Sequence, residues 1–228
     1  MVGGAPETVD GAGVVKEYGT PPIPSEFNMI CKTFTVLRDS ELLKDETTFQ
    51  VEYHNDEILV VPCSEFFDRS IEDEYISFLS AVVVAFLMFS KAEEALEDDR
   101  MIRLFGQALH QVVSTSVYEE KPEKPMVGIP THFKLFGKTV TVKGDHSIYR
   151  TKGCMGLAKP HECEILLLPH NDLIPRTGAD LLGTYLHEVV HLIFHAIGED
   201  DLCGSETTVN LLGSVLAQAF LSAEYENE

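Results

Sequence analysis

The sequence is short of positive charge and of any segment long enough to cross a membrane. Its 228 residues include 17 Lys and Arg against 37 Asp and Glu, which gives a formal net charge of −20. This charge disfavours nonspecific binding to nucleic acid and to anionic membranes. The longest nearly continuous apolar segment, residues 76–90, is shorter than the about 20 residues that a membrane-spanning helix needs. We therefore predict a buried core helix there.

The chain also has few cysteines, and no two of them lie close together in the sequence. The chain has five cysteines, an odd number, and no secretory signal is recognisable. We therefore expect reduced thiols and a cytoplasmic protein. Cys154 and Cys163 are the two closest to each other, but their spacing matches no common zinc-binding pattern. Structural thiols are the expected role for both.

The strongest functional signal is an HExxH motif, formed by His187, Glu188 and His191 in an apolar segment. On a helix, residues four apart share a face, so the two imidazoles can bind one metal ion while Glu188 reaches the water bound to it. Asp180 and Gly198 are a plausible start and stop for this helix. The alternative is an ordinary buried helix, which would leave these polar side chains without partners.

A catalytic zinc site usually takes three protein ligands and keeps a fourth position for water. The candidates for the third ligand are His195, Asp200, Asp201 and Glu206. His195 lies about 12 Å along the helix from His187, too far to bind the same ion. The two aspartates fall in a connection, where acidic side chains are usually solvated. Glu206 begins a second apolar helical pattern, and an antiparallel helix can return its carboxylate to the ion. Glu206 is therefore the expected ligand.

The two motifs together resemble a known family. The run HEVVHLIFH, followed by ETTVNLLG from Glu206 onwards, resembles the HExxHxxxH and ExxANxFA signatures of gluzincin-type ImmA/IrrE-like metallopeptidases, including short phage-type relatives. The resemblance implies that His187, His191 and Glu206 bind Zn²⁺ and that Glu188 is the catalytic base. It covers residues 180–220, with two departures in the second signature and a shorter gap between the two.

Much of the chain also repeats itself. Seven identities within residues 23–36 recur within residues 129–142 at a constant difference of 106 (129 − 23). Further identities within residues 58–111 recur within residues 165–218 at a difference of 107 (165 − 58). A shared helix and strand pattern alone would not repeat the Ile-Pro, Lys-Thr-x-Thr-Val and Gly-x-x-Leu-x-Gln identities. We therefore predict a tandem duplication.

The first copy lacks the metal ligands. The positions that correspond to the motif hold Ser80, Ala81 and Val84, and Asp99 stands opposite Glu206. One carboxylate therefore persists without a histidine partner. We expect this copy to be a degenerate, metal-free repeat.

The expected fold is α+β and zincin-like, with two tandem strand-strand-helix-helix units in one pseudo-symmetric body. The segments are a flexible tail over residues 1–20, a degenerate repeat over residues 21–118, a linker over residues 119–126 and the repeat with the HExxH site over residues 127–228. Residues 164–168 are expected to form the edge strand beside the active helix, where a peptide can pair, with turns at residues 152–156 and 159–160. An internal pseudo-dimer removes the need for a homodimer, so a monomer is expected.

These features predict a zinc-dependent hydrolase, best described as a metallopeptidase acting on a protein or peptide. Glu188 would take a proton from zinc-bound water and pass it to the leaving amine. His170, Tyr185 and His195 are candidate oxyanion donors, although each also suits a structural role. The alternative is a non-catalytic interaction protein, viral or from a mobile element, that keeps a zincin scaffold and acts through its acidic surface. A structural zinc is less favoured, because such sites usually have four protein ligands and commonly use Cys.

Overall fold

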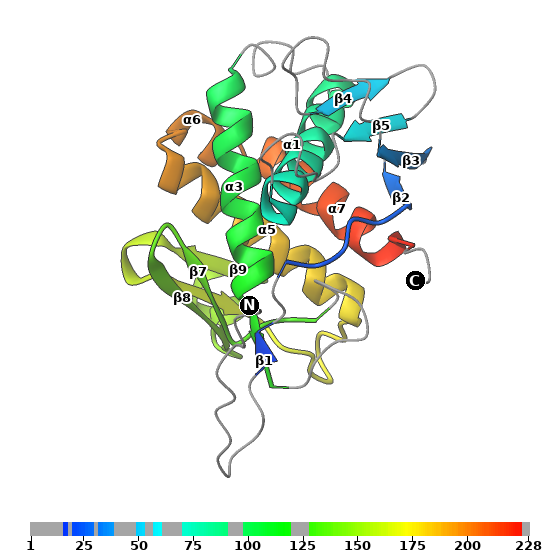
Figure 1. Ribbon diagram of the computed structural model, residues 1–228. Helices are drawn as coiled ribbons and strands as arrows, with labels where there is room; N and C mark the ends of the chain where they lie inside the picture. Colours follow the sequence, from blue (N-terminus) through cyan, green and yellow to red (C-terminus); the bar gives the residue numbers. More distant parts are fainter. Residues whose placement is uncertain are drawn as a thin grey trace.

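The structure is a computed structural model. It describes residues 16–17, 20–29, 32–38, 49–52, 57–60, 70–90, 98–119 and 128–224. Within these residues the fold is mixed α/β, with two sheets and six α-helices (Figure 1). No helix in this part of the chain is long and apolar enough to cross a membrane.

We call the first group of elements the N-terminal unit. It comprises β2 (Glu26–Met29), β3 (Lys32–Arg38), β4 (Phe49–Glu52), β5 (Glu57–Val60), α1 (Ile71–Ser90) and α3 (Asp99–Thr115). Its sheet has the order β2-β3-β5-β4, in which β3 and β5 are parallel and the outer pairs are antiparallel. Most of α1 is buried against α3 and this sheet. The apolar segment at residues 76–90 therefore forms part of a core helix, as its length predicts.

The second group is the C-terminal unit. It comprises β7 (His132–Leu135), β8 (Lys138–Gly144), α4 (Ile148–Lys152), β9 (Gly156–Lys159), the 3-10 helix η3 (Pro160–Glu162), β10 (Glu164–Leu167), α5 (Gly178–Ile197), α6 (Asp200–Cys203) and α7 (Glu206–Ser222). Its strands continue the order β7-β8-β10-β9, and β6 (Val117–Tyr118) and β1 (Lys16–Glu17) extend the sheet beyond β7. The edge of the sheet next to α5 is therefore β9.

The two units have the same strand order and the same register. In the N-terminal unit Val36 lies opposite Ile58 across the parallel pair, and in the C-terminal unit Val142 lies opposite Ile165. These partners differ by the same 106 and 107 positions that separate the repeated sequences. The first helices also begin alike: the Ser70 and Asp73 side chains and backbones bond reciprocally, as do those at the corresponding positions of α5.

Each unit completes the sheet of the other. The end of α3 leads into Val117, which pairs with His132 of β7, whereas the end of α7 leads into Glu224, which forms an antiparallel bridge with Glu26 of β2. Correspondingly, α3 packs against β7 and α7 against β2. A single hydrophobic core runs through both units. The rings of Phe105 and Phe194, one from each unit, lie 5.2 Å apart in it.

Several elements differ from the sequence-based expectation. Gly156 and Lys159, both expected in turns, are the two ends of the edge strand β9, and the expected edge strand at residues 164–168 is the internal strand β10. The expected tail includes the short strand β1 at Lys16–Glu17. Most of the expected linker lies outside the described residues.

Candidate metal centre and cleft

The HExxH residues converge on one side of α5. This helix begins with a capping box in which Thr177 and Asp180 bond reciprocally, and it ends at Gly198 in the left-handed conformation. Donor atoms of His187, Glu188 and His191 all lie within 4.8 Å of one another. This group can hold a metal ion.

The Nε2 atoms of the two histidines face each other, and a hydrogen bond orients the ring of His191. His191 Nδ1 lies 2.9 Å from the carbonyl oxygen of Cys203, which can only accept, so Nδ1 carries the proton and Nε2 presents a lone pair. His191 Nε2 lies 3.1 Å from His187 Nε2. Two lone pairs at this distance repel unless a cation or a proton lies between them.

A third donor approaches from α7. The carboxylate oxygens of Glu206 lie 3.5 Å from His187 Nε2 and 3.5 Å from His191 Nε2. Ligands about 2.1 Å from a tetrahedral zinc ion are about 3.4 Å from one another. The spacing of these three residues therefore suits such an ion.

A glycine allows α7 to come this close to α5. A Cβ added at Gly213 would lie 2.9 Å from the backbone N and Cα of His187. The same approach occurs in the N-terminal unit, where a Cβ added at Gly106 would overlap the hydroxyl of Ser80. The α5–α7 pair therefore requires glycine because backbone lies opposite it, whereas the atom closest to Gly106 is the end of a side chain.

Glu188 occupies a different environment from Glu206. It is 5% exposed, and its Oε2 accepts a hydrogen bond of 2.7 Å from the backbone N–H of Ala158 in β9. Burial raises the pKa of Glu188 to about 7, an effect that the Ala158 N–H opposes and the Glu206 charge assists. A carboxylate with this pKa can both accept and release a proton near neutral pH.

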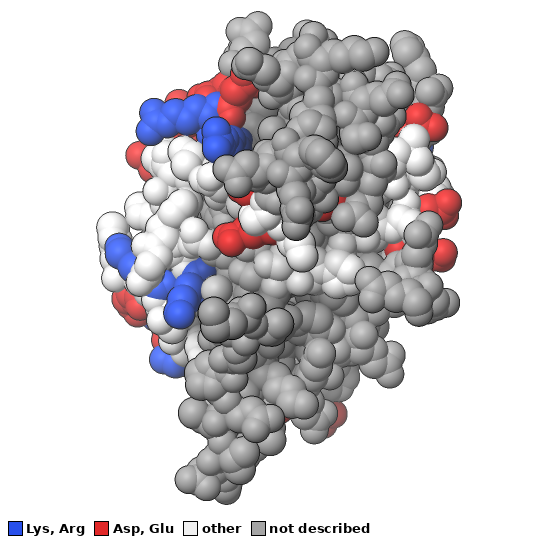
Figure 2. Space-filling view, viewed as in Figure 1, with Lys and Arg blue, Asp and Glu red and all other residues white. Residues whose placement is uncertain are grey.

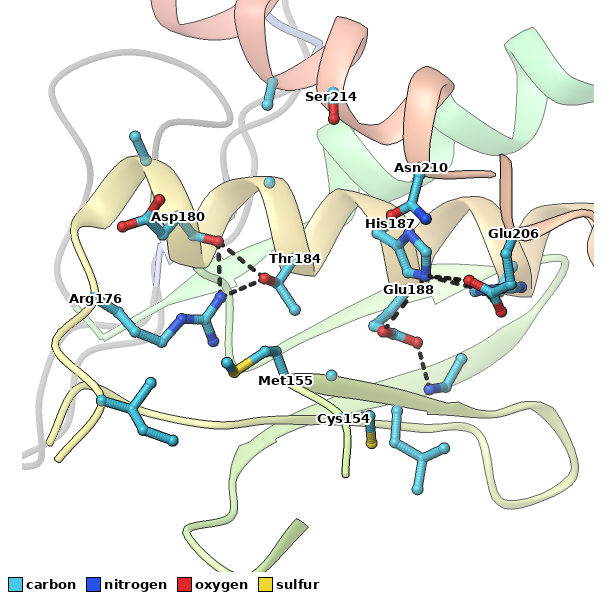
Figure 3. Close-up of a pocket in the computed structure, with 18 of the residues that line it drawn as sticks. Cys154, Met155, Arg176, Asp180, Thr184, His187, Glu188, Glu206, Asn210 and Ser214 are labelled. Atoms are coloured by element: carbon cyan, nitrogen blue, oxygen red, sulfur yellow. Dashed lines mark hydrogen bonds and ion pairs between the residues drawn. The ribbon is translucent and has the colours of Figure 1, made fainter. Parts of the chain in front are cut away.

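The surroundings of His187, burial above all, disfavour the charged form of its ring. Burial and the neighbouring His191 lower the pKa of His187, whereas Glu206 and Asn210 raise it. Its Nδ1 atom is buried without a well-formed hydrogen bond to the described residues. Asn210 points toward this ring from α7 (Figure 3). Neutral imidazole is the form that binds a metal ion.

The candidate metal centre opens into a cleft of about 1110 Å³. Its walls come from β9, the loop before α5, one face of α5 and the face of α7 that carries Glu206, Asn210 and Ser214 (Figure 3). Gly156 matters here, because a Cβ at this position would come within 2.5 Å of Glu188 Oε1. Glycine thus lets β9 lie directly against the HExxH residues.

The other sequence candidates lie elsewhere. His170, Tyr185, His195, Asp200 and Asp201 are absent from the described lining of the cleft. Tyr185 is fully buried, and His170 accepts a hydrogen bond from the backbone N–H of Arg176. His195 lines a separate cavity of about 340 Å³, where its ring lies 5.4 Å from that of His161. None of them is placed to contact a reacting group in the cleft.

Sequence reasoning missed several residues that shape the site. The backbone groups of Ala158 and Cys203 carry no sequence signal, because any residue supplies an N–H and a carbonyl. Asn210 follows Glu206 by four positions and so shares its helix face, which is a usable signal. Arg176 gave no signal in the sequence, yet it lines the cleft.

The N-terminal unit has no comparable group among its described residues. Ser80 and Ala81 are buried and Val84 is partly buried, all three within α1. Asp99 is exposed at the start of α3.

Comparisons with known proteins place the chain in no family: no protein-family model, no curated protein and no solved structure matches it.

Proposed function

We propose that the protein is a zinc-dependent hydrolase, and specifically a metallopeptidase of the ImmA/IrrE-like kind, with zinc on His187, His191 and Glu206. One observation carries the proposal. Three donors from two helices converge at distances of 3.1 and 3.5 Å beside a buried carboxylate whose pKa is about 7. A structural site would not need that carboxylate, nor an opening into a large cleft.

When bound, zinc would supply a Lewis acid that polarises a carbonyl and makes a water molecule easier to deprotonate. The residues of this chain supply the remaining chemistry. Cys203 fixes the tautomer of His191 through its carbonyl oxygen, and Gly213 lets α7 bring Glu206 to the two rings. Such supporting contacts orient ligands and strengthen metal binding.

Glu188 is the proposed general base. It accepts one proton from the water that attacks the peptide carbonyl, and it then gives this proton to the nitrogen of the leaving amine. The C–N bond breaks, the water oxygen stays on the carbonyl carbon, and a carboxylic acid and an amine are released. The N–H of Ala158 holds Oε2 of Glu188 at 2.7 Å, which leaves Oε1 for the proton transfer.

The edge of β9 is the proposed binding site for the peptide backbone. The N–H of Leu168 donates to the carbonyl of Met155, so residue 155 faces β10 and the alternation of a strand turns the backbone groups of Gly156 and Ala158 outward. The Ala158 N–H is already bonded to Glu188, which leaves its carbonyl and the Gly156 groups for a peptide. Within the described sheet no strand covers that edge. An extended substrate can therefore pair with β9 above α5.

We also propose that the chain is a duplicated zincin-like unit that forms one pseudo-symmetric body. The common strand order and register of the two units support this, as do their reciprocal contacts at Val117 and Glu224. Matched hydrogen bonds add support: Thr115 Oγ1 accepts from the N–H of Lys134, and Ser222 Oγ accepts from the N–H of Asn28. These pairs again differ by 106 and 107 positions.

A non-catalytic interaction protein is the second candidate, favoured by the net charge of −20 and by the loss of ligands in the N-terminal unit. In the view of Figure 2, basic and acidic side chains lie together over α3 and the β7–β8 hairpin, whereas the described surface near β2 and β3 carries acidic ones. The acidic surface near β2 and β3 suits a basic partner.

Metal content separates the two candidates. We would measure it by plasma mass spectrometry on chelator-free protein, together with His187→Ala and with His195→Ala as a control in the same helix. About one zinc per chain, lost only in His187→Ala, supports the open site. Metal-free protein after zinc is added back would reject the peptidase. Partner binding that survives complete removal of zinc would support the second candidate.

A further inference from the structure

Arg176 is the only Lys or Arg among the described residues that line the cleft. It is half-buried and reaches from the loop before α5 along the side of the helix that carries Glu188 (Figure 3). Its Nη1 donates to the carbonyl of Leu168 at 2.7 Å, and its Nη2 donates to the carbonyl of Asp180 at 2.8 Å and to the hydroxyl of Thr184. These contacts fix the guanidinium in one place.

The Asp180 carboxylate acts on this guanidinium only at a distance, without an ion pair. All three of its acceptors are uncharged oxygens, and two of its five N–H donors remain unused by these bonds. In the described part of the chain no carboxylate forms an ion pair with it. The Asp180 carboxylate instead caps α5 by bonding to Thr177. A cation held partly out of water without an anion is costly, and a bound anion would offset that cost.

The distance of Arg176 from the catalytic base is set by α5. Thr184, which the guanidinium contacts, precedes Glu188 by one turn of helix, or about 6 Å. An extended peptide advances about 3.3 Å per residue. The guanidinium is therefore placed about one to two residues from the bond that Glu188 would help to cleave.

The direction of β9 shows which side of that bond faces Arg176. A Cβ at Gly156 would meet Thr184 and Glu188, and η3, which follows β9, lies beside Leu192 and His195. The strand β9 therefore runs in the same direction as α5. A peptide that pairs antiparallel with β9, the slightly more stable arrangement, runs the opposite way. Its residues after the cleaved bond would thus extend toward Arg176.

We propose that Arg176 binds a substrate carboxylate that lies one or two residues after the cleaved bond, an inference that rests on the proposed peptidase function. The carboxylate is either the C-terminus of the peptide or an Asp or Glu side chain. Hydrolysis adds one water across the C–N bond and releases a short C-terminal fragment with its new amine, while the carboxylate at Arg176 is unchanged. The first source makes the enzyme one that trims peptide C-termini.

Three libraries of N-acetylated hexapeptides test this with the zinc-loaded full chain. One has free C-terminal carboxylates and no Asp or Glu, the second has the same sequences with C-terminal amides, and the third is amidated with Glu at the fourth position. Products are identified and timed by mass spectrometry. We expect about tenfold to hundredfold faster cleavage, one or two residues before the carboxylate, in the first library or the third relative to the second.

Variants separate substrate binding from a merely structural role. In Arg176→Met, the ratio of cleavage rates for peptides with and without the carboxylate should fall close to one, mainly through a change in KM. Arg176→Lys should retain an intermediate ratio because it keeps the charge. The matched control is Arg69→Met. Arg69 stands 107 positions before Arg176 in sequence, in the unit without the motif. It lies outside the described residues. This control should leave the preference unchanged.

Each outcome decides between the two proposals. Equal cleavage of all three libraries by the unmodified chain overturns the role of Arg176 and leaves the peptidase in place. An unchanged preference in folded Arg176→Met also overturns it, because Arg176 would then only hold the loop to α5. Failure to cleave any library, with Glu188→Gln behaving identically, rejects the peptidase function and this inference with it.

Discussion

The N-terminal and C-terminal units share one scaffold but differ in the buried side chains at the middle of the helices α1 and α5. Both have the same strand order, register and glycine at the helix crossing. At the positions equivalent to the HExxH residues, however, α1 carries Ser80, Ala81 and Val84, which pack within the helix core. The scaffold therefore forms without a His-Glu-His group, and the buried polar cluster of α5 needs a reason other than folding.

The comparison also separates what the fold requires from what the site adds. Glycine at positions 106 and 213 allows the same close helix pair in both units. In contrast, the backbone of β9 is held by Glu188, and Ala81 in the other unit offers no such acceptor. The following changes test this separation, from the largest expected effect to the smallest.

Replacing the proposed base should remove the activity of the C-terminal unit without removing its metal. Glu188→Gln should lower kcat by about a hundredfold to ten-thousandfold, the usual contribution of a positioned acid or base. Zinc content should stay near one per chain, because the ligands are untouched. Peptide turnover and plasma mass spectrometry check the two expectations, and unchanged turnover would remove Glu188 from the mechanism.

Glu188 should make the metal-free protein less stable as pH rises. Burial raises the pKa of Glu188 from its ordinary value of 4.5 to about 7. The folded state therefore holds this proton more tightly, so the associated stability is complete below pH 4.5 and lost as pH rises through 7. At pH 8 the free energy of unfolding of Glu188→Gln should exceed that of the unmodified chain by about 3 kcal/mol. At pH 4 the two free energies should be nearly equal. Urea unfolding in chelator measures this, and parallel pH profiles for the two proteins would contradict it.

Matched glycine substitutions should affect the two units differently. Gly213→Ala forces the backbone of His187 to move, because the new Cβ would lie 2.9 Å from it. We expect a loss of about 1–3 kcal/mol in stability and weaker zinc binding. Gly106→Ala conflicts mainly with the Ser80 side chain, which can rotate, and should cost less. Thermal unfolding and zinc titration of both variants test this. Equal zinc affinity in the two would show that the helix crossing does not position the ligands.

Removing the side chain beside His187 should have the smallest effect. Asn210 raises the pKa of His187 and faces its ring across the helix pair. Asn210→Ala should weaken zinc binding by about tenfold, as loss of a supporting contact usually does. Arg103 stands at the equivalent position of α3. Arg103→Ala is therefore the control that should leave zinc affinity unchanged in a competition with a chromogenic chelator.

The sequence could predict those elements whose residues form a recognisable pattern over a short stretch of chain. The helix around His187 and the second helix from Glu206 onwards followed from the spacing of apolar residues, and the structure has both. The repeated identities predicted matching segments, and the registers match them. The strand β9 was missed because Gly156 and Lys159 resemble turn residues. Its strand state comes from pairing with β10, which is a tertiary effect. Arg176 was missed because its cleft exists only after folding.

The reciprocal ends of the two units bear on how the chain is synthesised. Ser25 donates a hydrogen bond to Glu224, which lies 199 positions later, whereas the partner of Thr131 is the earlier residue Val117. During translation, Val117 has therefore been synthesised before the C-terminal unit needs it. The N-terminal unit, in contrast, can form its contact only after residue 224 leaves the ribosome. Contacts between distant positions slow folding. The unit that is made first is consequently completed last, because its contact with Glu224 forms only after both units have been made.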